Sequence, residues 1–158
     1  MTREQRYWDD VVEGEALESI AYPLTVYRLV MAAGANRDFN AIHHNSEFAK
    51  ATGAPEMYAN NYLLQGMWER TVRQYIGHSG VIRRLSAFRM RIFNTVGDTV
   101  VVKGRVARKW SEGATGLVEF EMHSENAKGV SVGPGRVVAT LPIRMNLNDR
   151  AAGFPSAC

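Results

Sequence analysis

The residue types with the clearest capacity for chemistry are gathered between Asn36 and Asn45, in the stretch NRDFNAIHHN. The carboxylate of Asp38 precedes the imidazole of His43 by five residues, and His44 follows directly. A carboxylate and an imidazole in one loop can hold a water molecule between them and act as a general acid–base pair. The same side chains could also ligate a metal ion, or they could be no more than part of a polar loop.

The metal-site hypothesis is the weakest of the three. Adjacent side chains in a loop diverge, so His43 and His44 are poorly placed to share an ion with Asp38, and no carboxylate is evident that would orient either ring. We therefore expect no metal ion, and we assign His44 a structural role. The acid–base hypothesis for Asp38 and His43 remains, although an isolated Asp and His at this spacing also occur in capped loops.

The length and composition of the chain indicate one domain. At 158 residues it is long enough to bury a substantial core, and its only cysteine, Cys158, is the last residue. We place the domain at residues 1–145 and expect a flexible tail at 146–158, where no hydrophobic periodicity appears. With no long apolar run and no secretory signal, we expect a cytoplasmic protein that does not enter membranes. The net charge of +3 is spread along the chain, which suits an anionic ligand but does not indicate nucleic-acid binding.

Two short helices are predicted on either side of the polar stretch. Thr25 is a suitable N-cap for a helix over 26–35, which the polar residues after it would end. Asn45 or Ser46 is a suitable N-cap for a second helix that ends at Gly53. The candidate acid–base residues would therefore lie in the loop between two helices.

The strongest helical pattern runs over 58–76. Its apolar residues recur at offsets of 3, 4, 7, 8 and 11 from the first, which is the spacing of one buried helix face. Gly77 is well placed to end this helix. The predicted buried face consists of Leu64, Met67, Trp68, Thr71, Val72 and Tyr75.

The second half of the chain changes to a period of two, which is typical of strands with one wet face. Four segments carry alternating or continuous apolar residues, with turn residues between them: 88–92, 99–106, 118–123 and 136–141, with turns at Gly97-Asp98 and 111–113. One long helix followed by four strands predicts an α+β fold, in which an antiparallel sheet wraps the helix.

The segment Asp38-Phe39-Asn40-Ala41-Ile42-His43, followed by Ala49, carries a family resemblance. It matches the pattern D-x-N-P-[LIV]-H-x5-A, with alanine where proline is usual, and it resembles the MaoC-like (R)-specific enoyl-CoA hydratases and dehydratases. The resemblance extends over about residues 7–143 and implies the hot-dog fold, in which the sheet wraps a long central helix. A second likeness is to the actinobacterial hydratases that act on steroid side-chain CoA thioesters, through Arg37-Asp38-Phe39, His43-His44 and Asn60.

The resemblance implies a hydro-lyase that adds water across the α,β double bond of an acyl thioester, or removes it in reverse. One of Asp38 and His43 would take a proton from water, and the other would deliver a proton to the α-carbon, in either assignment. Asn40 would brace the loop or the water. Backbone N–H groups near Asn60 and Asn61, at the start of the long helix, would hold the thioester oxygen, although many family members have His-Gly at these two positions.

The resemblance also implies ligands and partners. The substrate is expected to be a CoA or acyl-carrier-protein thioester, with coenzyme A as part of the substrate and no separate cofactor. Arg89 and Arg91 are candidates to bind the CoA phosphates. Tyr58, Tyr62 and Leu63 are candidates to line the acyl-chain site, although core packing explains them equally well. Because a single hot dog exposes a sheet edge, we expect a homodimer, with a heterodimer with another hot-dog subunit as the alternative.

Two other functions stay open on the sequence. A hot-dog acyl-CoA thioesterase would share the fold and the ligand, but thioesterases usually carry their carboxylate on the long helix, where Glu69 lies on the middle, polar face. A non-catalytic acyl-binding subunit of a heteromeric hydratase would not need Asp38 and His43, so their presence argues against it. The missing His-Gly keeps that alternative open.

Overall fold

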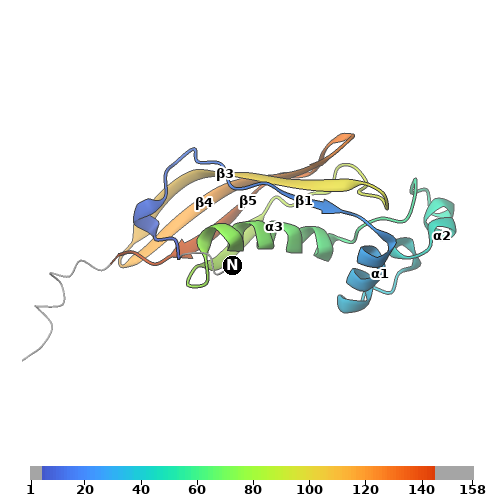
Figure 1. Ribbon diagram of the computed structural model, residues 1–158, viewed down its shortest axis with the longest axis horizontal. Coiled ribbons are helices and arrows are strands. Elements are labelled where there is room, and N and C mark those ends of the chain that lie inside the picture. The colour runs from blue at the N-terminus through green and yellow to red at the C-terminus, as the bar shows by residue number, and fades with distance from the viewer. Residues whose placement is uncertain (1–4, 145–158) are drawn as a thin grey trace, which may run out of the picture.

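The computed structural model describes residues 5–144, so the predicted tail at 146–158 lies outside the described residues. Its elements, in chain order, are η1 (Trp8–Asp10), β1 (Ile20–Pro23), α1 (Val26–Ala35), η2 (Ala41–His43), α2 (Ser46–Ala51), α3 (Asn61–Ile76), β2 (Val81–Ser86), β3 (Thr99–Glu112), β4 (Thr115–Asn126) and β5 (Gly129–Leu141). In this part of the chain, five strands form one antiparallel sheet in the order β1-β3-β4-β5-β2. Figure 1 shows α3 lying along one face of the sheet, with α1 and α2 grouped toward one end. The predicted α+β architecture is confirmed.

The helix α3 supplies the helical half of the core. Its predicted apolar face is confirmed, because all six of those residues are buried. The largest of them, Trp68, is fully enclosed, and its indole N–H donates to the hydroxyl of Ser124 on β4 at 2.7 Å. A buried indole N–H without an acceptor would be costly, so this bond fixes the helix against the sheet in one orientation. Gly77, with a left-handed φ of 73°, ends the helix as predicted.

The start of α3 differs from the prediction. The helix begins at Asn61, not at Tyr58. Tyr58 instead forms an isolated β-bridge with Thr95, and Asn60 caps the helix by accepting a hydrogen bond from the N–H of Leu63 at 2.8 Å. The helical turn can form only after this cap, which satisfies one of the free first-turn donors.

The two short helices are confirmed, and both use the predicted type of cap. Thr25 accepts a hydrogen bond from the N–H of Arg28 at 3.1 Å and precedes α1. Asn45 accepts from the N–H of Phe48 at 2.9 Å and precedes α2, which ends at Ala51, two residues before the predicted limit.

Three of the predicted strands are confirmed as parts of β3, β4 and β5, but the strand predicted at 88–92 is wrong. Within that segment only Met90 forms a bridge, to Val132 on β5. The edge strand is β2, which precedes it and ends before Ala87, a residue with a left-handed φ of 54°. The backbone pairing with β5 is interrupted at Ala87 and resumes in part beyond it. There the N–H of Gly133 donates to the carbonyl of Arg89, and the N–H of Arg91 donates to the carbonyl of Ser131, both at 2.8 Å.

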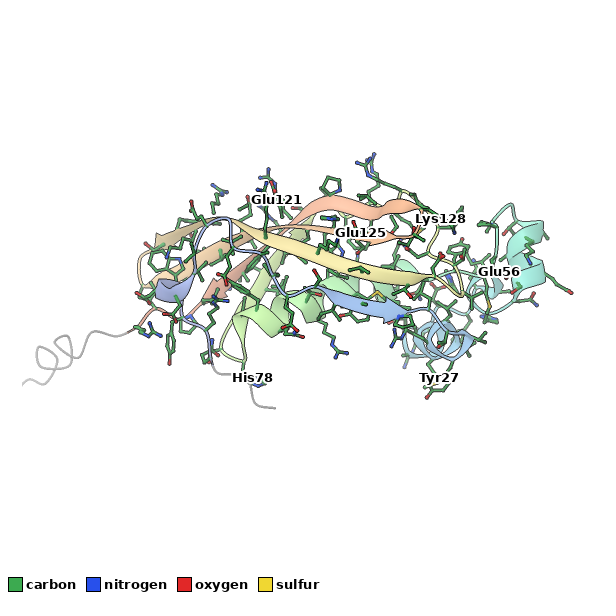
Figure 2. All side chains as sticks on the ribbon, turned by 45° about the horizontal axis from the view of Figure 1, so that its top comes forward. Tyr27, Glu56, His78, Glu121, Glu125 and Lys128 are labelled. Atoms are coloured by element: carbon green, nitrogen blue, oxygen red, sulfur yellow. The ribbon has the colours of Figure 1, made fainter. Side chains whose placement is uncertain are left out.

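The face of the sheet away from α3 carries matched charges. Lys103 pairs with Glu125, and Arg105 pairs with Glu121, across the β3–β4 ladder. Figure 2 shows Glu121 and Glu125 projecting from this face. Glu119 is buried between two arginines, with N···O distances of 3.4 and 3.1 Å. Such cross-strand pairs stabilise the sheet and leave its other face to pack on α3.

Among the described residues, no helix is both long enough and apolar enough to cross a bilayer. Within the same residues, no three His, Cys, Asp or Glu side chains are grouped so that they could hold a metal ion. The single domain at 1–145 and the cytoplasmic location stay predictions.

Candidate active site

Asp38 is presented by the loop that follows α1. After Ala35 the chain reverses: Arg37 adopts a left-handed φ of 55°, and its N–H donates to the carbonyl of Gly34 at 3.1 Å. The N–H of Asp38 reaches back to the carbonyl of Ala33 at 2.9 Å. These bonds satisfy the last carbonyls of the helix and hold the carboxylate close to the helix end. The Asp38 side chain is 29% exposed, so it meets both solvent and protein.

His43 lies in the short η2 turn. Asn40 caps this turn, because its side-chain oxygen accepts from the N–H of Ile42 at 3.2 Å. The imidazole is buried, and its Nδ1 lies 2.8 Å from the backbone carbonyl oxygen of Tyr58. A carbonyl oxygen can only accept, so the partner assigns a hydrogen to Nδ1, which donates.

The contact between Nε2 of His43 and Oδ2 of Asp38 measures 3.1 Å. In a neutral imidazole with its hydrogen on Nδ1, Nε2 would face the carboxylate as a second acceptor. The contact is favourable only when one proton lies between the two groups, as in an imidazolium–carboxylate pair. The geometry is therefore that of a pair that holds one proton and can both accept and release one.

Asn60 connects this pair to the start of α3. Its Nδ2 donates to Oδ2 of Asp38 at 3.2 Å, while its Oδ1 accepts from the N–H of Leu63 at 2.8 Å. Asn36 adds a longer bond, from its Nδ2 to Oδ1 of Asn60 at 3.5 Å. Because His43 and Asn60 both reach Oδ2 of Asp38, Oδ1 of that carboxylate has no partner within residues 5–144 and is available to a water molecule.

Asn61 and Tyr62, the first two residues of α3, line the cavity that Asp38 and His43 also line. First-turn N–H groups have no partner inside their helix, and no residue of the described chain accepts from these two. The positive end of the helix dipole adds to their capacity to hold an oxyanion. This cavity has a volume of about 400 Å³. It is lined by Asp38, Ile42, His43, Tyr58, Ala59, Asn60, Asn61, Tyr62, Gln65 and Met90.

Tyr58 forms one wall of this cavity. Its ring meets His43 edge-on at 5.2 Å and Phe93 at 4.8 Å between centroids. Burial, and to a smaller extent the negative charge of Asp38, raises the pKa of the Tyr58 phenol above its ordinary value. The hydroxyl therefore stays protonated at neutral pH and can donate a hydrogen bond within the cavity.

Comparison with known proteins identifies relatives of similar fold. No protein-family model matches the chain. A curated relative, the 3-oxo-4,17-pregnadiene-20-carboxyl-CoA hydratase beta subunit of Mycobacterium tuberculosis, is 27% identical over 117 residues, which are 74% of this chain and 83% of that protein. A chain in the crystal structure of the ChsH1–ChsH2 complex from Mycobacterium tuberculosis matches with a TM-score of 0.74 and 26% identity, over 84% of this chain and 98% of that chain. The (R)-hydratase PhaJ1 of Pseudomonas aeruginosa matches with a TM-score of 0.77 and 17% identity, over 96% of this chain and 95% of that chain.

The chain has the hot-dog fold. Its structural neighbours include MaoC-like dehydratases and (R)-hydratases, so the predicted fold and the predicted resemblance are confirmed. In this hot-dog domain, Asn60 and Asn61 stand where the resemblance leads one to expect His-Gly. The structure shows what they do instead: Asn60 caps α3, and the N–H of Asn61 is left free beside the cavity.

Six of the predicted site residues line the hot-dog cavity: Asp38, His43, Tyr58, Asn60, Asn61 and Tyr62. Asn40 braces η2 instead, and Leu63 lines a neighbouring cavity. Arg89 and Arg91 lie at a separate hollow, where Arg91 donates to the backbone carbonyl of Gly133. Their contact with a substrate stays a prediction.

Met90 and Asn36 take part in the site without having been predicted. Met90 lines the cavity. Its alternation with Arg89 and Arg91 hinted that these side chains face different ways, but the segment is not a strand, so the pattern did not specify it. Asn36 acts through its bond to Asn60, a contact over 24 residues for which the sequence carries no local signal.

Proposed function

We propose that this protein is a hydro-lyase that adds water across the α,β double bond of a 2-enoyl-CoA thioester, or removes it in the reverse direction. The observation that carries the proposal is the convergence of Asp38, His43 and the free N–H groups of α3 on one cavity. Hydration of an enoyl thioester needs a base, an acid and hydrogen-bond donors for the thioester oxygen. The proposal includes (R) stereochemistry, which is supported by the (R)-hydratases that share the fold.

The Asp38–His43 pair would make both proton transfers. Oδ1 of Asp38 accepts a hydrogen from water as the water oxygen attacks the β-carbon, and the proton held at Nε2 of His43 passes to the α-carbon. The Tyr58 carbonyl keeps the other ring nitrogen protonated throughout, so Nε2 is the atom that exchanges. The pair begins and ends with one proton, so the cycle closes without a net change, and dehydration follows the same steps in reverse.

The charge that develops on the thioester oxygen during this addition needs fixed donors. The N–H groups of Asn61 and Tyr62 would supply them, and such preorganised donors are commonly among the largest contributions to catalysis. Asn60 touches both parts of this machinery, because one end of its amide bonds Asp38 and the other caps the helix. The side chain of Asn60 would therefore fix the position of the base relative to the oxyanion donors.

The thioesterase alternative receives less support. Glu69 is 59% exposed, pairs with Arg73 at 3.6 Å and does not line the cavity. A hydrolytic carboxylate on the long helix would have to face the thioester, and this one faces solvent.

We propose that the protein works with a second hot-dog subunit. The curated relative is the beta subunit of a hydratase, and one structural relative comes from a ChsH1–ChsH2 complex. The same observation favours a second candidate function, a non-catalytic acyl-binding subunit of such a complex. Mass in solution, measured alone and after co-expression with a hot-dog homologue, separates a homodimer from a heterodimer.

The decisive experiment follows the absorbance of the enoyl thioester and the release of free CoA in the same reaction. Crotonyl-CoA and bulkier enoyl-CoAs, including steroid-type thioesters, should lose the enoyl absorbance without releasing CoA. Release of CoA without hydration would support the thioesterase. If no thioester reacts with the protein alone or with any co-expressed homologue, the binding subunit is the better conclusion.

Asn60→Asp should separate the two roles of this residue. Aspartate caps a helix as well as asparagine, so α3 should keep its N-cap. A second buried carboxylate beside Asp38 should nevertheless lower the unfolding temperature at neutral pH, so rates are compared at a temperature at which the variant is folded. The amide donor to Asp38 is replaced by a second carboxylate, and losing a hydrogen bond to a charged group costs about 1.5–3 kcal/mol, so kcat/KM should fall by roughly tenfold or more. The acidic limb of the pH–rate profile should also move to higher pH, because two close carboxylates retain a proton more readily.

Asn45→Asp is the matched control for this change. Asn45 caps α2 in the same way, through the N–H of Phe48, and it does not line the cavity. This variant should keep both the rate and the pH profile of the wild type. Equal rates and profiles for Asn60→Asp and wild type would show that Asn60 is only a cap.

A further inference from the structure

A second cavity lies between α1 and α3, beside the candidate active site. It has a volume of about 370 Å³, within the range of small-molecule sites. Tyr62, whose side chain is 63% exposed, lines both cavities. Asn36 lines the second cavity and donates to Asn60, which lines the first. The two spaces are therefore neighbours, separated by one tyrosine ring and a pair of hydrogen-bonded amides.

Part of the wall of the second cavity is apolar. α1 contributes Ala32 and Ala35, and α3 contributes Leu63 and Met67. Gly66 on α3 widens the space, because a Cβ added there would meet no atom within 4 Å. These four side chains would accept hydrocarbon, while Tyr22, Asn36 and Tyr62 add polar atoms to the same lining.

Two guanidinium groups border the same cavity. Arg28 is partly buried, donates to the carbonyl of Pro23 at 2.8 Å and lies over the ring of Tyr22 at 5.8 Å. Arg70 is exposed on α3. Within residues 5–144, neither pairs with a carboxylate, whereas Arg73, one turn further along α3, pairs with Glu69. The cavity therefore combines an apolar wall, formed by α1 and α3, with unneutralised positive charge at its border.

We infer that this cavity binds the far end of the acyl group, and that Arg28 and Arg70 select acyl groups that end in a carboxylate. The inference rests on the proposed function for the position of the thioester, which would lie in the first cavity. A guanidinium binds a carboxylate with two parallel hydrogen bonds, which a neutral methyl terminus cannot accept. The substrate class is thus a medium-chain or bulky enoyl thioester with an apolar body and an anionic terminus.

The test uses saturated thioesters, which bind but cannot be hydrated. The dissociation constants of decanoyl-CoA and of its ω-carboxylate analogue, the mono-CoA thioester of decanedioic acid, are measured by calorimetry. The ω-carboxylate should bind the wild type about tenfold more tightly. Arg70→Gln should remove most of that difference, while Arg73→Gln, the same change at a paired arginine outside both cavities, should keep it.

A second variant tests the cavity itself. Gly66→Leu places a side chain in the open space and improves the helix propensity of α3, so the protein should fold. Binding of both ten-carbon thioesters should weaken several-fold relative to butanoyl-CoA, which is too short to leave the first cavity.

Three results would overturn the inference. These are equal affinity of the wild type for the two ten-carbon thioesters, equal effects of the Arg70 and Arg73 changes, or unchanged binding in Gly66→Leu. Turnover of the whole enoyl-CoA panel, crotonyl-CoA included, is measured separately. Its absence would count against the proposed hydratase and not against the acyl site, because the binding measurements need no turnover.

Discussion

Asp38→Asn is expected to lower kcat/KM for a 2-enoyl-CoA by about a hundredfold or more, which is about 2.7 kcal/mol of transition-state stabilisation. The substitution keeps the shape of the side chain but removes its capacity to take a proton from water. It also removes the negative charge that Nε2 of His43 and the amide of Asn60 both face at 3.1 and 3.2 Å. Stopped assays measure the rate of hydration and the release of free CoA. Unfolding curves for each protein show that the variant is folded.

Glu69→Gln is the control for that variant. It also changes a carboxylate to an amide, but on the exposed face of α3, away from the cavity. Hydration should be unaffected by it. A large loss in Glu69→Gln with little loss in Asp38→Asn would reverse the assignment and favour a thioesterase.

The elements that could be predicted from the sequence are those whose pattern is local. The buried stripe of α3 follows from spacing alone, and the caps at Thr25 and Asn45 follow from residue type. The segment 88–92 alternates as well as any strand, yet it is not one. The left-handed φ of Ala87 interrupts the pairing of β2 with β5 just before this segment, and an alanine in the sequence gives no signal for that conformation. The short edge strand β1 carries too few residues for any period to show.

The candidate site also has parts that the sequence predicts and parts that it does not. Asp38 and His43 could be proposed from the sequence because one loop holds both. The features that decide their chemistry come from contacts across 15 and 22 residues, namely the Tyr58 carbonyl on Nδ1 and the Asn60 amide on Oδ2. No pattern in the sequence specifies a backbone carbonyl as a partner. The tautomer assigned to His43 therefore follows only from contacts that exist in the folded chain.

The shared proton leads to a specific prediction for the His43→Ala variant. Removing the imidazole should cost about a hundredfold or more in kcat/KM, since no other described side chain approaches Asp38 with a proton to deliver. It also leaves the partly buried Tyr58 carbonyl without its donor, so the unfolding free energy should fall by about 1–3 kcal/mol. Rates are therefore compared at a temperature at which each variant is folded.

The double variant Asp38→Asn/His43→Ala tests whether the two residues act as a unit. If one proton passes between them in every turnover, either single change disables the pair, and the double variant should be little slower than the slower single variant. Two groups acting independently would instead multiply their losses, to about ten-thousandfold or more if each costs about a hundredfold. Multiplied losses would contradict the shared-proton pair, even if each single variant behaved as expected, and would point to separate acid and base steps.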